Sequence, residues 1–196
     1  MINARVLSGI RALSALVVLM TSVFAAHAQE TNDRKVERIR KIYSETNAKI
    51  EKVEKGGEED RLAGIAVNEL VVNKTGKSWP AVGNFREVYR FYYDSDGESP
   101  YPSKLLKISK ATESAARKYF EEYVFDRSGN LIFYFEKTED GEVPLERRVY
   151  FDSGKAFRFI DDGKTRDKLS EEDEIVANDI LATENTLRGI FEATLN

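Results

Sequence analysis

Apolar side chains recur every three or four positions from about Asp33 to Lys55, which is the spacing of a helix with one buried face. Charged residues fill the positions between them. Gly56 and Gly57 end the pattern, as glycine does where a helix closes in a left-handed cap. The apolar positions of this predicted helix are Val36, Ile39, Ile42, Tyr43, Thr46, Ile50 and Val53.

A second helical pattern covers about Glu171 to Leu195. Ser170 stands before it and Asp173 follows three residues later, the spacing of a capping box. Its apolar positions are Ile175, Val176, Ile180, Leu187, Ile190, Phe191 and Leu195. The sequence therefore predicts one helix near each end of the chain.

Alternating apolar and polar residues between these helices indicate β-strands separated by short turns. Such connections make consecutive strands antiparallel neighbours. We therefore predict an α+β fold: an N-terminal helix, a curved antiparallel meander of six or seven strands, and a C-terminal helix, with the helices covering one face of the sheet. The predicted strands are Ile65–Asn73, Arg86–Asp94, Lys104–Ser109, Arg117–Asp126, Asn130–Thr138, Val143–Asp152 and Lys155–Ile160.

Three strand ends share one plan, in which an aromatic or β-branched residue runs into Asp, then small or polar residues, then Gly. They are Tyr92-Tyr93-Asp94-Ser95-Asp96-Gly97, Val124-Phe125-Asp126-Arg127-Ser128-Gly129 and Tyr150-Phe151-Asp152-Ser153-Gly154. Asp accepts backbone hydrogen bonds at a turn and Gly takes the positive φ that a hairpin needs. The segments resemble the Tyr-Asp-x-x-Gly hairpins of bacterial YD-repeat and MORN-like surface proteins. The whole pattern also resembles small uncharacterised secreted proteins of Gram-negative bacteria, a resemblance that implies no known activity.

Strand alternation divides the meander into two faces. Odd-numbered positions give a nearly dry face, predicted to lie beneath the helices: Tyr119, Tyr123, Phe125, Leu131, Phe133, Phe135, Leu145, Val149, Phe151, Phe157 and Phe159. Even-numbered positions mix aromatic rings with Arg and Glu: Phe120, Glu122, Val124, Ile132, Tyr134, Glu136, Glu146, Arg148, Tyr150, Arg158 and Ile160.

The mixed face supports two interpretations. In the first, Glu and Arg form cross-strand ion pairs over half-exposed tyrosines, each contributing a few tenths of a kcal/mol. In the second, the face is concave and Tyr134, Arg148, Tyr150 and Arg158 bind a ligand or partner, because Tyr and Arg dominate binding hot spots. The loop around Trp79, the only tryptophan, either closes one end of the core or stacks on a ligand.

The first 28 residues have the pattern of an export signal. Arg5 and Arg11 precede an uncharged apolar stretch, and Ala26-His27-Ala28 supplies the small residues that signal peptidase requires. We expect cleavage after Ala28, leaving one domain of residues 29–196 in the periplasm or outside the cell. The alternative is an uncleaved N-terminal anchor.

Removal of that segment would leave a chain without His, Cys or Met. The single histidine and both methionines lie within it, and the chain has no cysteine. The usual imidazole base, thiolate nucleophile and soft metal ligands are then excluded, so we expect neither a cofactor nor a metal site. The remaining 28 basic and 34 acidic residues give a net charge of −6, which argues against nucleic acid as a partner.

Three functions remain open. The leading hypothesis is an exported, non-enzymatic binding protein for a small anionic or sugar-like ligand or a protein partner. The second is a hydrolase of envelope polysaccharide that uses a pair of carboxylates. The third is a structural or assembly protein of the cell envelope, with strand edges or the basic side of the first helix as contact surface: Arg34, Lys35, Arg38, Arg40 and Lys41.

Overall fold

The structure is a computed structural model. It describes residues 32–56, 64–80, 83–94, 104–115, 117–139 and 145–195. The predicted signal peptide, residues 1–28, lies outside the described residues. The chain divides into two compact units, residues 1–38 and residues 39–196, and the sheet and the C-terminal helix belong to the second.

Among the described residues, two helices form close to the predicted positions. The N-terminal helix covers residues 32–55, of which 39–55 belong to the second unit. Helix α2 covers Glu171–Ala193. The predicted capping box is confirmed, because the Asp173 backbone N–H donates to Ser170 Oγ at 3.2 Å and Asp173 Oδ2 accepts from the Ser170 N–H at 3.0 Å.

In the described part of the chain, nine strands form an antiparallel sheet, two more than the upper prediction. All seven predicted strands are present, and the two additional ones are the short strands β2 and β9. The strands are β1 Ile65–Val72, β2 Ser78–Trp79, β3 Gly83–Asp94, β4 Lys104–Ser114, β5 Arg117–Phe125, β6 Leu131–Glu139, β7 Leu145–Asp152, β8 Lys155–Asp161 and β9 Lys164–Arg166.

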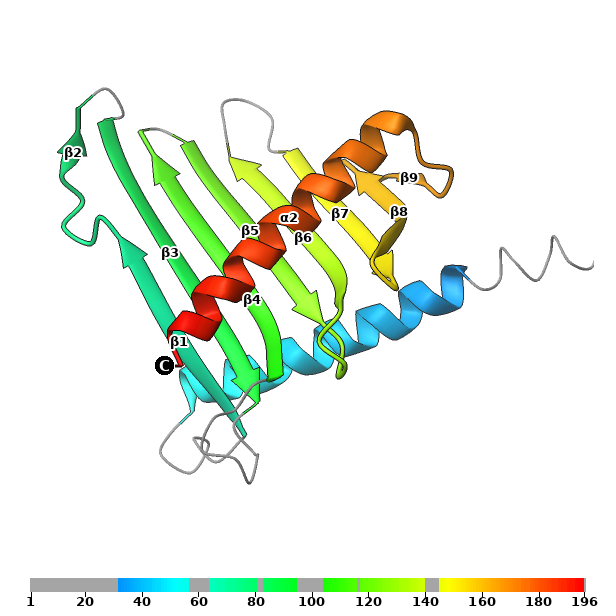
Figure 1. Ribbon diagram of the computed structural model, residues 1–196, viewed down its shortest axis with the longest axis horizontal. Coiled ribbons are helices and arrows are strands. Elements are labelled where there is room, and N and C mark those ends of the chain that lie inside the picture. Colours follow the sequence, from blue (N-terminus) through cyan, green and yellow to red (C-terminus); the bar gives the residue numbers. More distant parts are fainter. Residues whose placement is uncertain are drawn as a thin grey trace, which may run out of the picture. The chain divides into compact units, whose positions relative to one another are not determined.

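The sheet is a meander in which β1 pairs with β3 and the later strands follow in chain order to β9, while β2 pairs only with β3 (Figure 1). Two of its turns have the predicted chemistry, whereas the third predicted Asp-to-Gly turn runs into residues 95–97, which lie outside the described residues. Asp126 Oδ1 accepts from the backbone N–H groups of Ser128 at 2.8 Å and Asn130 at 2.9 Å. Between β7 and β8, Ser153 and Gly154 have φ values of 53° and 76°, as a two-residue hairpin turn requires.

Helix α2 packs diagonally across one face of the sheet (Figure 1). Phe191 lies against two strand β3 rings, with centroids 5.8 Å from Phe91 and 5.3 Å from Tyr93. Burial of such large side chains stabilises a fold by about 1.5–3 kcal/mol each. The buried core on this face comprises Phe91, Tyr93, Leu105, Ile108, Tyr123, Phe125, Leu131, Tyr134, Val149, Phe151, Phe159, Ala177, Ile180, Leu187 and Phe191.

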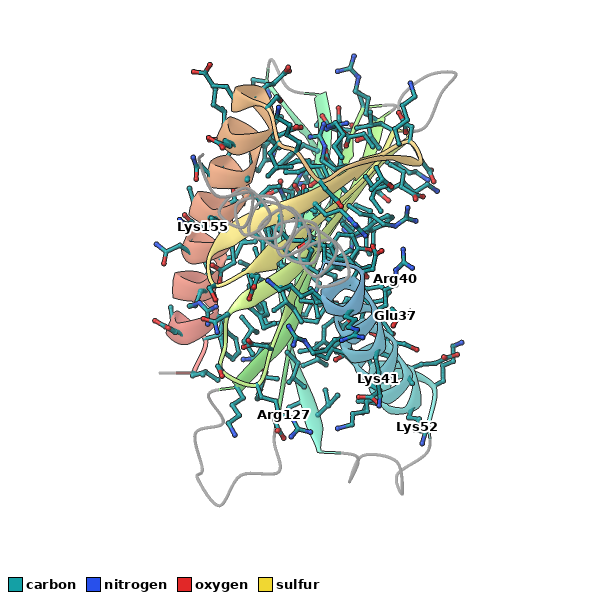
Figure 2. All side chains as sticks on the ribbon, turned by 90° about the vertical axis from the view of Figure 1, so that its right-hand side faces the viewer. Glu37, Arg40, Lys41, Lys52, Arg127 and Lys155 are labelled. Carbon is teal, nitrogen blue, oxygen red and sulfur yellow. The ribbon has the colours of Figure 1, made fainter. Side chains whose placement is uncertain are left out.

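Residues 39–55 of the N-terminal helix, which belong to the second unit, lie on the other face, so the prediction that both helices cover one face is wrong (Figure 2). Its Ile50 forms a second apolar cluster with Ile65 and Tyr92. Polar contacts also connect this helix to the sheet, among them the hydrogen bond from the Tyr92 hydroxyl to Glu54 Oε1 at 2.7 Å. The mixed aromatic and charged face is therefore partly covered by a helix rather than left open.

Strand β6 presents the predicted face at Leu131 but the opposite faces from those predicted beyond Ile132. Phe125 pairs with Leu131 and Val124 with Phe133, so Ile132 is an extra residue in a β-bulge. Beyond the bulge an even-numbered residue of β6 lies opposite an odd-numbered residue of β5, as Tyr134 does opposite Tyr123. Phe133 consequently faces the N-terminal helix, and Tyr134 faces α2.

Candidate functional site

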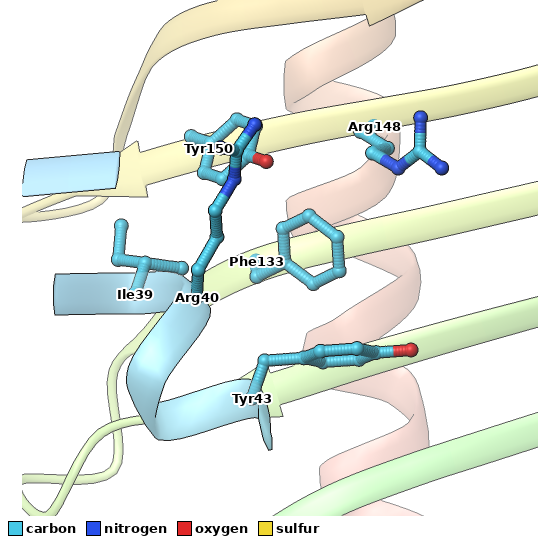
Figure 3. A pocket seen from close by; sticks show the side chains of 6 residues that line it. All are labelled: Ile39, Arg40, Tyr43, Phe133, Arg148 and Tyr150. Atoms are coloured by element: carbon cyan, nitrogen blue, oxygen red, sulfur yellow. The ribbon is translucent and has the colours of Figure 1, made fainter. Parts of the chain in front are cut away.

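An open cavity of about 400 Å³ lies between the start of the second unit's helical segment and strands β6 and β7 (Figure 3). Its volume falls within the range of about 300–1,000 Å³ that is usual for small-molecule sites. Three lining residues come from the helix and three from the strands. They are Ile39, Arg40, Tyr43, Phe133, Arg148 and Tyr150.

The local structure explains why these side chains converge. Ile39 and Tyr43 are four residues apart, so they lie on the same side of the helix. On the sheet, Phe133 pairs directly with Tyr150 across β6 and β7. Arg148 is two residues before Tyr150 and therefore shares its face. The β6 bulge is essential, because without it Phe133 would point to the α2 face.

Three aromatic rings form a continuous wall in the cavity. The Phe133 ring lies 5.2 Å from Tyr43 in an edge-on arrangement and 5.1 Å from Tyr150 in a tilted one, measured between centroids. These are favourable separations for aromatic pairs. Tyr150 and Phe133 are buried, with exposed fractions of 1% and 6%. The wall is thus held in a fixed geometry before any ligand arrives.

Two guanidinium groups border this wall. Arg40 is exposed, and within the described residues it has no acidic partner. Arg148 forms an ion pair with Glu146, and its guanidinium carbon lies 5.6 Å from the centre of the Phe135 ring. The cavity therefore combines one uncompensated cation with one that is held by a neighbouring carboxylate.

A buried polar network holds the Tyr43 ring in place through its hydroxyl group. The Tyr43 hydroxyl donates to Glu122 Oε2 at 2.7 Å. Glu122 is ion-paired with Lys107, whose ammonium also donates to Asn47 Oδ1 at 2.8 Å. Burial, and then the hydrogen bond to Glu122, raise the pKa of Tyr43 to about 12. Tyr43 consequently stays neutral near pH 7 and serves as a rigid wall rather than as a base.

Two of the five predicted site residues, Arg148 and Tyr150, line this cavity. Tyr134 does not, because the β6 bulge turns it to the opposite face, where its hydroxyl donates to Glu121 Oε1 at 3.2 Å. Burial raises the pKa of Tyr134 above its usual range, so this tyrosine is a neutral core residue.

The other two predicted residues lie elsewhere. Arg158 pairs with Tyr150 across β7 and β8, but its guanidinium makes two hydrogen bonds to Asp167, at 2.5 and 2.6 Å. Trp79 is on β2 and contacts Phe85 with 5.3 Å between ring centroids. It is 42% exposed, and neither residue lines the cavity.

Four lining residues are not among the predicted site residues: Ile39, Arg40, Tyr43 and Phe133. Periodicity had placed Ile39 and Tyr43 on a buried helix face, which is correct, but it cannot show that part of that face borders a cavity. Arg40 is one of five cations on the basic side of this helix, and charge alone does not distinguish it from the other four.

The α2 face carries a row of charged side chains across the sheet. Signs alternate along most of this row, but Glu121 and Glu136 lie directly opposite each other in the β5–β6 ladder. Burial is the largest of the effects that raise the pKa of Glu136, and the Glu121 charge adds to it. The row contains Glu87, Lys110, Glu121, Glu136, Arg147, Asp161, Arg166 and Asp173.

Within the described part of the chain, no three His, Cys, Asp or Glu side chains are grouped as a metal site would require. No helix in the same residues combines the length and apolarity needed to cross a membrane.

Comparisons with protein-family models, curated proteins and solved structures found no match. The resemblance to YD-repeat and MORN-like hairpins accordingly rests on the three short turn segments alone.

Proposed function

We propose that this chain is a binding protein that holds a small anionic ligand in the cavity between the N-terminal helix and strands β6 and β7. The observation that carries the proposal is that Arg40, Arg148 and three aromatic rings line the same cavity. Arginine recognises carboxylate and phosphate groups through paired hydrogen bonds. Aromatic rings provide apolar contact area that is already ordered.

The composition of the cavity favours binding over catalysis. None of its six lining side chains is a carboxylate, imidazole, thiol or aliphatic hydroxyl. General acid–base catalysis works best with a group whose pKa lies near the operating pH, whereas the pKa of Tyr43 is about 12. The polysaccharide-hydrolase alternative requires a pair of carboxylates. Glu121 and Glu136 lie opposite each other across β5 and β6, but they already pair with Lys110 and Arg147 respectively.

A thermal-shift screen of the purified protein tests this proposal. The panel contains aromatic and aliphatic carboxylates, phosphate esters, neutral sugars and muropeptides. A ligand at 100 times its Kd adds about 2.7 kcal/mol to the free energy of unfolding, which raises Tm by several degrees in a domain of this size. We expect anionic compounds to raise Tm in the parent protein and in the control Lys52→Gln, but not in Arg40→Gln/Arg148→Gln.

Lys52 is a suitable control because it is an exposed cation of the same helix that does not line the cavity. If no anionic compound raises Tm, or if the double variant responds as the parent does, the proposal is wrong. A protein partner or a role in envelope assembly would then be the better hypothesis.

We also propose that the protein is exported and acts after cleavage behind Ala28. The support is the order of residue types in residues 1–28, where positive charges come first, an apolar stretch follows and small residues stand at the end. Expression of the full chain in a Gram-negative host should give a periplasmic protein that begins at Gln29 by mass spectrometry. Ala28→Lys should block this cleavage. Recovery of the parent chain only in the cytoplasm, with residues 1–28 intact, would contradict export.

A further inference from the structure

We infer that the ligand is an organic monoanion with a flat ring system, such as an aromatic monocarboxylate. This inference rests on the proposed function and specifies the ligand of the same cavity. It follows from two properties of the cavity, its net charge and the kind of surface that its side chains present.

The charge around the cavity amounts to one positive unit. Arg40 has no acidic partner among the described residues, whereas the charge of Arg148 is balanced by Glu146. The deeper pair of Lys107 and Glu122 is also neutral as a unit, since the two side chains are ion-paired. A ligand with one negative charge therefore neutralises the site. A dianion would bring a second negative charge, and the cation left to balance it, Arg148, is already paired with Glu146.

The remaining lining surface is apolar. Ile39 and the faces or edges of three rings provide it, and no neutral amide or aliphatic hydroxyl is present. The Tyr43 hydroxyl already donates its hydrogen to Glu122. A sugar would leave many of its hydroxyl groups without partners here, and each such loss is costly. A flat ring can instead stack on one of these three rings and contact the others at their edges, because neighbouring rings are inclined by 65° and 54°.

The shape of the wall favours a ring over a flexible chain. The Phe133 ring is in contact with a tyrosine ring on each side, so the three rings extend as one rigid surface. A rigid flat ligand loses little conformational entropy on binding, whereas an alkyl chain must order each of its torsions. Figure 3 shows the Arg40 side chain reaching across toward Tyr150, with Arg148 on the other side of Phe133.

Isothermal titration of the purified protein with four matched compounds tests the inference. The compounds are 2-naphthoate, its neutral amide 2-naphthamide, acetate, and the dianion 2,6-naphthalenedicarboxylate. We expect 2-naphthoate to bind at least about tenfold more tightly than the amide, because a charge-assisted hydrogen bond is worth that ratio. It should also bind more tightly than acetate and than the dianion.

Two pairs of variants assign the binding to the cavity. Arg40→Gln should weaken 2-naphthoate at least about fivefold and leave 2-naphthamide nearly unchanged, while the control Lys52→Gln should alter neither. Phe133→Leu should weaken both naphthyl compounds. Its control is Phe120→Leu, a change at a partly exposed ring on the same face of the sheet that does not line the cavity.

The outcomes separate this inference from the proposed function. If the amide or acetate binds as tightly as 2-naphthoate, the inferred ligand class is wrong. The same holds if the dianion binds best and its binding depends on Arg40, in which case the cavity is still a binding site. If no anion binds in a manner that depends on Arg40, both the inference and the proposed function are wrong.

Discussion

Tyr43 and Glu122 join the N-terminal helix to the sheet through a hydrogen bond of 2.7 Å between the tyrosine hydroxyl and Oε2 of the carboxylate. The two residues are 79 positions apart in the chain. Together they fix one wall of the cavity, because the Tyr43 ring packs edge-on against Phe133. Loss of this contact should therefore affect both the stability of the protein and the shape of the cavity.

Tyr43→Phe should lower the free energy of unfolding by about 1–3 kcal/mol, the usual cost of losing a hydrogen bond to a charged group. The ring contact with Phe133 remains, so the fold should persist. Urea denaturation measures the change. Tyr119→Phe is the matched control, because Tyr119 is a half-buried tyrosine on the α2 side of the sheet. Equal stability of the two variants would show that the contact contributes nothing.

Lys107→Met should destabilise the protein by about 3–5 kcal/mol, because it leaves the Glu122 carboxylate buried without its cation. Both side chains are less than a tenth exposed. In the double variant Lys107→Met/Glu122→Gln no unpaired charge remains, and the carbonyl oxygen of the new amide still accepts from Tyr43. We expect the double variant to be more stable than Lys107→Met alone. If the destabilisations by Lys107→Met alone and Glu122→Gln alone simply add up to that of the double variant in urea denaturation, the two charges do not depend on each other and this account of the pair is wrong.

Asp173→Asn should remove a stabilisation that depends on pH. The hydrogen bond from Arg166 holds the pKa of Asp173 at about 2, below its ordinary value of 3.8. An acid whose pKa is lower in the folded state than in the unfolded chain stabilises the fold at any pH above its unfolded pKa. This stabilisation disappears as the pH falls from about 4 to 2. Because Arg166 is partly exposed and screened by solvent, we expect a loss of about 1–2 kcal/mol at pH 7.

Denaturation curves from pH 7 to pH 2 check this effect. The parent and Asp173→Asn should converge as the pH approaches 2. Glu172→Gln changes an exposed acid in the first turn of the same helix, and it should remain close to the parent throughout. A constant gap between the parent and Asp173→Asn across this range would exclude the ionised carboxylate as the cause.

Glu136→Gln should stabilise the protein at pH 7. Burial raises the pKa of Glu136, and the facing Glu121 adds to this effect, against the opposing charge of Arg147. An acid whose pKa is higher in the folded state than in the unfolded chain destabilises the fold once the pH exceeds its unfolded pKa. We expect a gain in the free energy of unfolding at pH 7 that disappears as the pH falls below the pKa of an unfolded Glu, about 4.3.

The matched control for Glu136→Gln is Glu139→Gln on the same strand. The hydrogen bond from Lys137 lowers the pKa of Glu139, so removal of this charge should not stabilise the protein. If Glu136→Gln is less stable than the parent at pH 7, its ion pair with Arg147 outweighs both burial and the repulsion from Glu121.

Most elements of the fold were predictable because local patterns determine them. The capping box at Ser170 and the Asp126 and Ser153-Gly154 turns mark where elements begin and end, and the structure contains them as predicted. The short strands β2 and β9 were missed because two or three residues are too few to show alternation.

The arrangement of the two faces was not predictable in the same way. Alternation shows which side chains of one strand share a face, but register between strands decides how those faces combine. The extra residue in the β6 bulge moved Phe133 into the cavity and Tyr134 out of it. Both helices have an apolar side, and neither pattern indicates which face of the sheet that side covers.

A structure of the protein determined in the presence of 2-naphthoate tests the central claim most directly. We expect the naphthyl ring to lie against Phe133 and the carboxylate to lie within hydrogen-bond distance of Arg40 or Arg148. An empty cavity at saturating 2-naphthoate, or the compound bound only at another surface such as that around Trp79, would contradict the claim.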